Sequence, residues 1–407
     1  MDRRKLLVGG AALIGAASLP RTYAQAQSAP EKIRIGYAIS ISGPLGAGAE
    51  NTTISQYKLW NKVVNDAGGI ALKKYNKKVP VEMVAYDDRG QPDELLKLLD
   101  RLILQDKVDL ILSPYATHMN MAAAPIVNKY EQPVIFTTAG SAKIYELAKS
   151  WPYAFWSIVQ PNEGTLPLVE MCAALKKEGK IRGRVAAVYV AQQSMVEMHA
   201  AFVGAATKAG LDVVLSKSYP FNTSDLQPLV REVMAADPDA FIAFSYPGDT
   251  FLLTEQMQTV GFDPQIYYAA IGSAFAAFKG KYGENVEGIL TYDGINRDAP
   301  GFAEYNKAHI EILKRPAQVA STGVFGCLQV LQQSVEKVGE IDRKKIRDQI
   351  ANGKFETVWG TIEFKDQRNQ HPWAVGQWQN GQVVGVFPTR LAGAKPVIFP
   401  KPRWKKQ

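Results

Sequence analysis

Residues 33–48 of the chain read IRIGYAISISGPLGAG, a run of strand-forming residues that gives way to hydroxyl residues and glycines. Ile33 to Ser40 predicts a buried strand. The apolar residues between Ile54 and Val64 recur at helical spacing and stop at Gly68-Gly69, which tolerates the left-handed backbone of a helix end. Residues 79–85 then alternate between apolar and polar side chains and predict a second strand. This order of elements indicates a parallel sheet with helices on its faces.

The same alternation continues along the 407-residue chain, which is long enough for two hydrophobic cores. Further short apolar runs predict strands at residues 108–112, 133–137, 185–190, 213–219, 241–245 and 266–270. Between the two groups, Trp151 to Trp156 has neither helical nor strand periodicity, so we expect the chain to cross from one lobe to the other there. A second crossing is expected at Gly288 to Ile295. We therefore expect an α/β fold of two lobes, each a parallel sheet flanked by helices, joined by strand-like crossings.

The expected boundaries assign residues 31–152 and 289–345 to the first lobe and residues 153–288 and 346–390 to the second. Residues 319–338 predict one long amphipathic helix, and Asn380-Gly381 predicts the turn of a hairpin. Residues 391–407 are expected to form a tail. Its basic residues are expected to be solvated, and they are Lys401, Arg403, Lys405 and Lys406.

The first 26 residues are typical of an export signal. Arg3, Arg4 and Lys5 precede an apolar run from Leu6 to Leu19, and small residues near Ala26 suit signal peptidase. The apolar run is shorter than the roughly 20 residues that span a bilayer. We expect a cleaved signal peptide at residues 1–26 and a free protein in the periplasm. The general secretory route and the twin-arginine route both remain open.

The sequence offers no pattern typical of an enzyme or a metal site. The four histidines are His118, His199, His309 and His371, and none are paired at the spacing that places two imidazoles on one helix face for zinc. There is no nucleophile elbow and no SxxK motif. Cys172 and Cys327 lie in apolar helical stretches, and we expect two buried free thiols. We expect no enzymatic activity, no metal and no cofactor, and export excludes a nucleic-acid partner.

Three loops that follow predicted strands are rich in small hydroxyl residues. They are Ser40 to Gly43, Ser113 to Thr117, and Thr137 to Ser141. Ligands of open parallel sheets bind outside the carboxyl ends of the strands, and helix N-termini there present unpaired amides to a carboxylate. Each loop alone is equally explained as a helix cap. Three loops converging from one sheet favour a polar pocket.

In order and spacing, several segments together resemble one family. The segments are Ile33 to Gly36 followed by Ser42-Gly43-Pro44, residues 65–70 (NDAGGI), Ser113 to Tyr115, residues 122–126 (AAAPI), residues 132–134 (QPV) and residues 288–290 (GIL). Behind an export signal, they resemble the exported solute-binding proteins of ABC importers, in the branch that includes the leucine/isoleucine/valine-binding proteins. The resemblance covers nearly all of the chain after the signal.

This resemblance implies a type I periplasmic binding protein, whose two lobes close over one small ligand and dock on a membrane permease. The ligand carboxylate would be held by the first lobe, at the positions Tyr115, Ala116, Thr117, Thr138 and Ala139. An acidic residue of the second lobe would pair with the α-ammonium of an amino acid. Asp249 is the candidate for that role, and its alternative role is to cap the helix that begins near Thr250.

Two positions depart from the family pattern. Met195 stands where relatives commonly carry a tyrosine that faces the ligand, and Trp156 stands where many carry an arginine. Together with Tyr115 and Tyr246, these residues predict an aromatic-lined cleft that can cover a flat or branched side chain. The departures weaken any transfer of leucine specificity to this chain.

The expected function is capture of a small carboxylate, with a hydrophobic or branched-chain amino acid as the first choice. An aromatic acid or an amide is the alternative ligand, and a ligand-presenting sensor module is the alternative role. The expected partners are this small molecule and a membrane permease, and the expected oligomeric state is a monomer.

Overall fold

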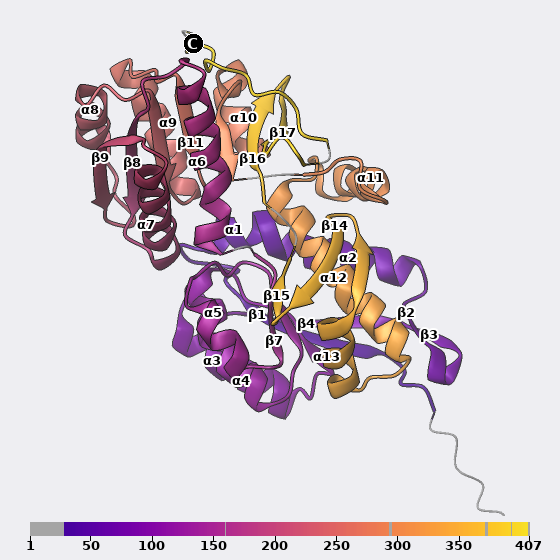
Figure 1. The fold of residues 1–407 in the computed structure, drawn as a ribbon. Helices are drawn as coiled ribbons and strands as arrows, with labels where there is room; N and C mark the ends of the chain where they lie inside the picture. Colours follow the sequence, from indigo (N-terminus) through magenta and orange to yellow (C-terminus); the bar gives the residue numbers. More distant parts are fainter. Residues whose placement is uncertain (1–27, 159, 293–294, 371–372, 392, 406–407) are drawn as a thin grey trace, which may run out of the picture.

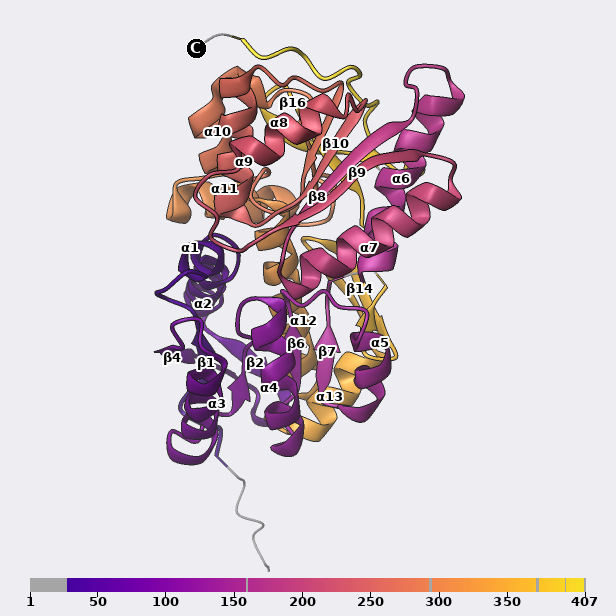
Figure 2. The ribbon, with the colours of Figure 1, turned by 90° about the vertical axis from the view of Figure 1, so that its left-hand side faces the viewer.

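The chain folds around two separate hydrophobic cores. A computed structural model describes residues 28–158, 160–292, 295–370, 373–391 and 393–405, so the predicted signal peptide lies outside the described residues. One core draws on residues between Ile33 and Trp156 and between Ile295 and Phe364. The other draws on residues between Leu168 and Leu290 and between Val375 and Val386. We call the two bodies lobe 1 and lobe 2, and they lie end to end in Figures 1 and 2.

Lobe 1 is built on short parallel strands extended by strands from late in the chain. Its strands are β1 (Ile33–Ile39), β4 (Val81–Asp87) and β5 (Leu110–Ile111) in one sheet, and β6 (Val134–Phe136), β7 (Ala154–Trp156), β15 (Arg368–Asn369), β14 (Gly360–Lys365) and β13 (Lys354–Thr357) in another, with a small hairpin of β2 (Ile70–Leu72) and β3 (Lys77–Val79). Its helices are α1 (Gly46–Ala49), α2 (Ser55–Asp66), α3 (Pro92–Asp100), α4 (Thr117–Lys129), α5 (Ile144–Leu147), α11 (Phe302–Leu313), α12 (Val319–Val338) and α13 (Arg343–Asn352).

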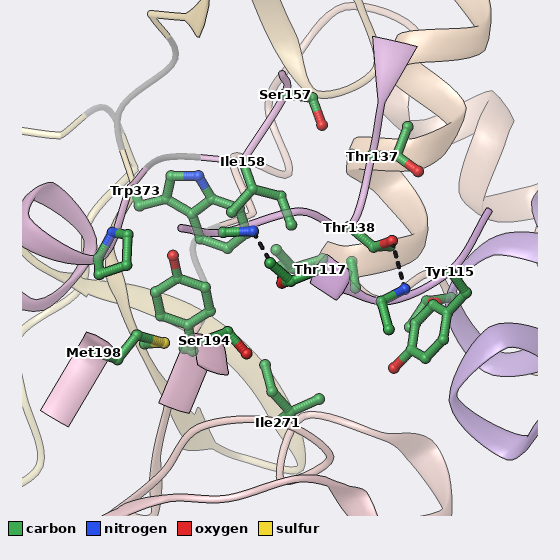
Figure 3. Close-up of a pocket in the computed structure, with 18 of the residues that line it drawn as sticks. Tyr115, Thr117, Thr137, Thr138, Ser157, Ile158, Ser194, Met198, Ile271 and Trp373 are labelled. Atoms are coloured by element: carbon green, nitrogen blue, oxygen red, sulfur yellow. Dashed lines mark hydrogen bonds between the residues drawn. The ribbon is translucent and has the colours of Figure 1, made fainter. Parts of the chain in front are cut away.

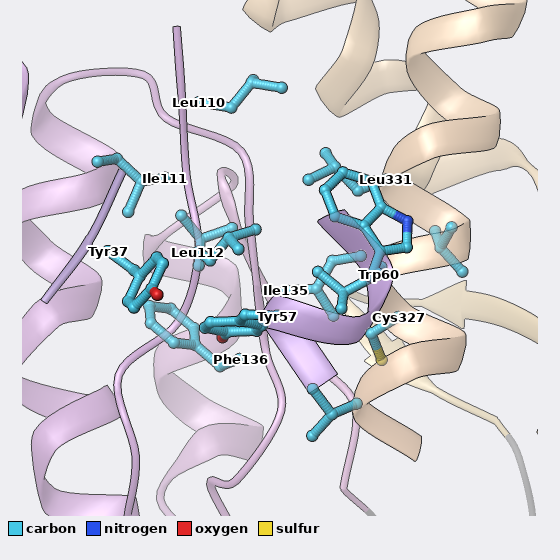
Figure 4. Packing of buried hydrophobic residues seen from close by; sticks show 14 of the residues in the cluster. Tyr37, Tyr57, Trp60, Leu110, Ile111, Leu112, Ile135, Phe136, Cys327 and Leu331 are labelled. Carbon is cyan, nitrogen blue, oxygen red and sulfur yellow. The ribbon is translucent and has the colours of Figure 1, made fainter. Parts of the chain in front are cut away.

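The core of lobe 1 fixes the loop that follows β5. Figure 4 shows Trp60 of α2 beside Leu331 and Cys327 of α12, and both helices contribute fully buried side chains. On the same face of α2, the Tyr57 hydroxyl donates a hydrogen bond to the carbonyl oxygen of Ser113 (2.8 Å). Because Ser113 lies two residues after the end of β5, packing of α2 on α12 sets the position at which the chain leaves the sheet.

Lobe 2 is a seven-stranded sheet with helices on its faces. The strand order is β17 (Gln382–Phe387), β16 (Val375–Gln379), β12 (Leu290–Tyr292), β11 (Ile266–Ala269), β10 (Ala240–Phe244), β8 (Arg184–Val190) and β9 (Asp212–Tyr219). The helices are α6 (Pro161–Lys177), α7 (Gln193–Lys208), α8 (Gln227–Ala235), α9 (Pro247–Val260) and α10 (Ala276–Tyr282). The predicted hairpin is confirmed as β16 and β17, whose turn holds Asn380 and Gly381 at φ of 52° and 73°.

The expected boundary of lobe 2 is wrong in two places. Residues 346–364, expected in lobe 2, pack in lobe 1, where Ile346 and Ile350 of α13 and Ile362 of β14 are fully buried. Residues 154–156, expected near the start of lobe 2, form β7 of lobe 1. The reason is a long-range pairing that no local pattern shows: Trp156 of β7 pairs with Arg368 of β15.

Among the basic residues of the expected tail, Arg403 and Lys405 are exposed, but the expectation that they are solvated is wrong for Lys401. Lys401 is buried, its Nζ donates to Asp263 Oδ1 (2.7 Å), and it lies 3.6 Å from the ring centroid of Trp404. The Trp404 indole in turn donates to the carbonyl oxygen of Phe262 (2.9 Å). An ion pair, a cation–π contact and the apolar lysine stem together hold this basic segment against lobe 2.

Two other expectations concern cysteines and membrane contact. Cys172 and Cys327 are buried free thiols, as predicted. Within the described ranges, no helix combines the length and the apolar character that crossing a membrane requires.

Candidate functional site

A cavity of about 120 Å³ lies between the lobes, where loops that follow parallel strands of the two lobes meet (Figure 3). Its lining residues are Thr52, Tyr115, Ala116, Thr117, Thr137, Thr138, Gly140, Ser157, Ile158, Pro161, Ser194, Met195, Met198, Tyr246, Ile271, Tyr292, Val319, Ala320, Gly323, Trp359 and Trp373. Tyr115 follows β5 and Thr138 follows β6 in lobe 1, while Tyr246 follows β10 and Ile271 follows β11 in lobe 2. The cavity therefore occupies the place at which parallel α/β sheets bind ligands.

Two loops of lobe 1 are joined by hydrogen bonds at the cavity wall. The Ala116 amide donates to Thr138 Oγ1 (3.0 Å), and the Gly140 amide donates to Thr117 Oγ1 (3.2 Å), as the dashed lines in Figure 3 show. These bonds hold the loop after β5 against the loop after β6. Polar groups from two strands thus face one small space in fixed positions.

Ala116 adopts a backbone conformation that disfavours every residue except glycine. Its φ is 77° and its ψ is 149°, and the residue is buried. Such a conformation costs roughly 1–3 kcal/mol and persists only where the surrounding contacts impose it, most often at functional sites. Here it turns the chain into α4, so that the N-terminal end of this 13-residue helix begins at Thr117 on the cavity wall. The partial positive charge of that end favours an anion.

Another part of the wall is aromatic. Tyr292 of β12 stacks on Trp373 with ring centroids 4.5 Å apart and an interplanar angle of 11°. Trp359, in the turn between β13 and β14, meets Trp373 edge-on at 5.7 Å. Trp359 and Trp373 were not predicted as site residues. Trp359 comes from the segment that was assigned to the wrong lobe, and no motif marks Trp373.

Six of the nine predicted site residues line the cavity. They are Tyr115, Ala116, Thr117, Thr138, Met195 and Tyr246. Burial raises the pKa of Tyr115 and of Tyr246, so both phenols stay protonated at neutral pH. The Tyr246 hydroxyl forms a hydrogen bond with Ser194 Oγ (3.0 Å) across the lobe 2 side of the cavity.

Ala139 and Trp156 lie elsewhere. Ala139 sits between two lining residues, but its side chain is fully buried in lobe 1. Trp156 is fully buried too, and it stacks on Phe136 with centroids 4.8 Å apart. The expectation that Trp156 lines the cleft is corrected because its segment is a core strand and not a crossing.

Asp249 caps a helix in this structure. It is the third residue of α9, and it accepts a hydrogen bond from the backbone amide of Tyr246 (3.3 Å) as part of a capping box. It is 6% exposed and does not line the cavity. Burial raises the pKa of its carboxyl group to about 6. The geometry thus agrees with the capping alternative and places the carboxylate away from the cavity wall.

One carboxylate joins the two lobes beside the cavity. Glu197 of α7 in lobe 2 accepts hydrogen bonds from Ser141 Oγ (2.9 Å) and from the amide of Ala142 (2.6 Å), which lie in the loop after β6. The Gln193 side chain donates to the same carboxylate (3.2 Å). These bonds exist only while the lobes are in contact.

Within the described ranges, no three His, Cys, Asp or Glu side chains are grouped so that they could hold a metal ion. The groups on the cavity wall can donate and accept hydrogen bonds and can cover a ring or a branched chain. This arrangement suits binding.

The sequence profile of the family described as "Periplasmic binding protein" matches residues 32–382. The chain belongs to this family. Members of this family bind solutes and are not enzymes, as the sequence predicted. Two curated relatives from Brucella abortus are named Leu/Ile/Val-binding protein homologs 7 and 8. They are 29% identical over 199 residues and 28% identical over 205 residues, covering 46% and 47% of this chain. The chain spans about half the length of these relatives, at 50% and 51%.

Solved structures of similar fold confirm the two-lobed architecture. A leucine-binding protein from Thermotoga maritima has a TM-score of 0.71 at 19% identity and covers 88% of this chain and 100% of its own. A solute-binding protein from R. palustris in complex with benzoate has a TM-score of 0.74 at 20% identity, covering 90% and 99%. A branched-chain amino acid binding protein from Streptococcus pneumoniae in complex with isoleucine has a TM-score of 0.73 at 18% identity, covering 86% and 97%. At these identities the likeness shows the fold alone.

Proposed function

We propose that this chain is the extracytoplasmic solute-binding protein of an ABC importer and that it captures a small aromatic carboxylate between its lobes. The observation that carries the proposal is the division of the cavity wall into two chemistries. The hydroxyl groups of Thr117 and Thr138 and the N-terminal end of α4 form one part of the wall, and the rings of Tyr292, Trp359 and Trp373 form another part.

Each part matches one half of such a ligand. A carboxylate is stabilised by the partial positive charge of a helix N-terminus and by oriented hydroxyl donors. A flat ring packs on aromatic side chains, and each such contact contributes about 0.5–1.5 kcal/mol beyond the burial of its area. The benzoate complex of a protein with the same fold supports this ligand class.

A hydrophobic amino acid is the second candidate. The curated relatives are named Leu/Ile/Val-binding proteins, and the Streptococcus pneumoniae structure contains isoleucine. Branched side chains would pack against Met195, Met198 and Ile271 on the lobe 2 side of the cavity. This candidate needs a partner for the α-ammonium, a role for which the sequence suggested Asp249.

The cellular setting completes the proposal. Membership of the family and the predicted signal peptide support a periplasmic location, and the two-lobed fold supports delivery of the ligand to a permease. We propose a monomer, because both lobes border the cleft and would have to reach the same permease. A sensor module that presents the same ligand to a receptor is the alternative role.

A thermal denaturation screen tests the ligand class. Benzoate and hydroxybenzoates are compared with leucine, isoleucine, valine and phenylalanine. A ligand at a hundredfold excess over its Kd stabilises the protein by about 2.7 kcal/mol. We expect the aromatic acids to raise the melting temperature, and we expect Ile271→Trp, which fills the cavity, to abolish the shift. Stabilisation by the amino acids alone would favour the second candidate, and no stabilisation by either class would refute carboxylate binding.

A further inference from the structure

The hydroxyl group of Thr138 has its two acceptor positions occupied. Thr138 Oγ1 accepts one hydrogen bond from the Ala116 amide (3.0 Å) and a second from Asn120 Nδ2 (2.9 Å). A hydroxyl oxygen carries two lone pairs and one hydrogen. With both lone pairs engaged, the remaining hydrogen of Thr138 can only be donated.

The direction of that hydrogen is set by what surrounds it. Within the described chain, the acceptor that the Thr138 hydroxyl faces is the carbonyl oxygen of Pro114, which lies 3.4 Å from Thr138 Oγ1. This distance is well beyond the 2.7–2.8 Å typical of a hydroxyl donor. Thr138 lines the cavity. The hydrogen is therefore available to an acceptor inside the cavity.

Asn120 controls this arrangement from a fully buried position on the first turn of α4. Besides the bond to Thr138, its Nδ2 donates to the carbonyl oxygen of Ala116 (2.7 Å). Both hydrogens of the amide group are thus used. A flipped amide would place Oδ1 against the Ala116 oxygen at that distance, so the orientation with Nδ2 toward Thr138 is the favourable one. It is kept although Oδ1 is buried without a hydrogen-bond partner among the described residues.

We propose that Asn120 is a positioning residue that fixes the Thr138 hydroxyl as a donor, so that the cavity selects a ligand whose head group only accepts hydrogen bonds. The inference rests on the proposed function and refines it. An ionised carboxylate only accepts, whereas a carboxamide of the same shape must turn its NH2 group toward one of the donors on the wall, either Thr138 or the end of α4. The acid is therefore bound more tightly than its amide.

The test compares benzoate with benzamide by calorimetric titration of the wild type, Asn120→Ala, Thr138→Val and Thr138→Ser. In Asn120→Ala the Thr138 hydroxyl is free to accept, so we expect benzoate affinity to fall about tenfold and benzamide affinity to change less than about threefold. Thr138→Ser should keep the wild-type preference for the acid. Thr138→Val should lose it without disturbing the bond between Asn120 and Ala116. The double variant Asn120→Ala/Thr138→Val should bind benzoate no more weakly than Thr138→Val alone.

Equal losses for acid and amide in Asn120→Ala would overturn the inference, because a merely structural role weakens both ligands alike. If Asn120→Ala does not fold, the test rests on Thr138→Val. An unchanged ratio of benzoate affinity to benzamide affinity in that variant would overturn the inference. Wild-type protein that binds benzoate but prefers benzamide refutes the inference and leaves the proposed function standing. Wild-type protein that binds neither benzoate nor any other aromatic acid refutes the proposed function and the inference with it.

Discussion

Asp249 combines two opposing effects at one side chain, because its cap favours the ionised form while its burial favours the neutral form. Burial dominates and raises its pKa from 3.8 to about 6. The native protein then binds the proton more tightly than the unfolded chain. The stabilisation that results is fully present below about pH 4 and is lost as the pH rises through 6.

Asp249→Asn keeps a side-chain oxygen for the Tyr246 amide and removes this titration. We expect the free energy of unfolding of the wild type, relative to the variant, to fall by up to about 3 kcal/mol between pH 4 and pH 7. Urea denaturation at a series of pH values measures the difference. A difference that stays constant with pH, or one that grows in favour of the wild type as the pH rises, would show that Asp249 has an ordinary or lowered pKa.

The lack of a side chain at Gly48 leaves the space that the ring of Tyr115 occupies. A Cβ atom at Gly48 would lie 2.4 Å from the Tyr115 hydroxyl oxygen and 2.7 Å from the ring carbon that bears it. Gly48→Ala should therefore push the ring into the cavity and weaken ligand affinity about tenfold or more, as measured by calorimetry. Gly204→Ala on α7 is the matched control, because nothing lies within 4 Å of its added Cβ. Equal affinities in the two variants would show that Tyr115 moves away from the cavity instead.

The contact between α7 and the loop after β6 is a link between secondary-structure elements of different lobes. The Glu197 carboxylate accepts two hydrogen bonds from lobe 1, and they stabilise only the arrangement in which the lobes touch. Hydrogen bonds to a charged group contribute about 1.5–3 kcal/mol when buried and less at a half-exposed site. Glu197→Ala should therefore weaken ligand affinity about fivefold by favouring separated lobes.

The control for this contact is Glu170→Ala, which removes an exposed carboxylate from α6. Calorimetric titration of both variants with the same ligand measures the effect. A dissociation constant for Glu197→Ala that matches the control would show that the contact adds nothing to closure.

Helices and strands whose formation depends on neighbouring residues in the sequence could be predicted from the sequence pattern. The strands β8 to β11 lie within a residue of the runs that predicted them, and β8, β10 and β11 are largely buried, as strands inside a parallel sheet are. The helix expected at 319–338 is α12. The partners of β13 to β15 could not be predicted, because the pairing of β15 with β7 joins residues far apart in sequence. The error placed residues 346–364 in the wrong lobe.

Whether the sequence could predict a site residue depended on how the chain passes between the two lobes. Tyr115 and Thr117 follow β5 and Thr138 follows β6, so each lies beyond the carboxyl end of a parallel strand, where α/β folds bind their ligands. Trp359 and Trp373 reach the cavity only because the chain returns to lobe 1 and crosses again late in the sequence. Trp156 and Asp249 failed as lining residues because a core strand and a helix cap use the same residue types as a binding site.

A crystal structure of the protein with the aromatic acid that most raises its melting temperature tests the central claim most directly. We predict that the ligand lies between the lobes, with a carboxylate oxygen within hydrogen-bond distance of Thr138 Oγ1 and its ring against Tyr292, Trp359 and Trp373. A ligand bound outside this cavity, or one whose ring faces the N-terminal end of α4 while its carboxylate faces the tryptophans, would contradict the account.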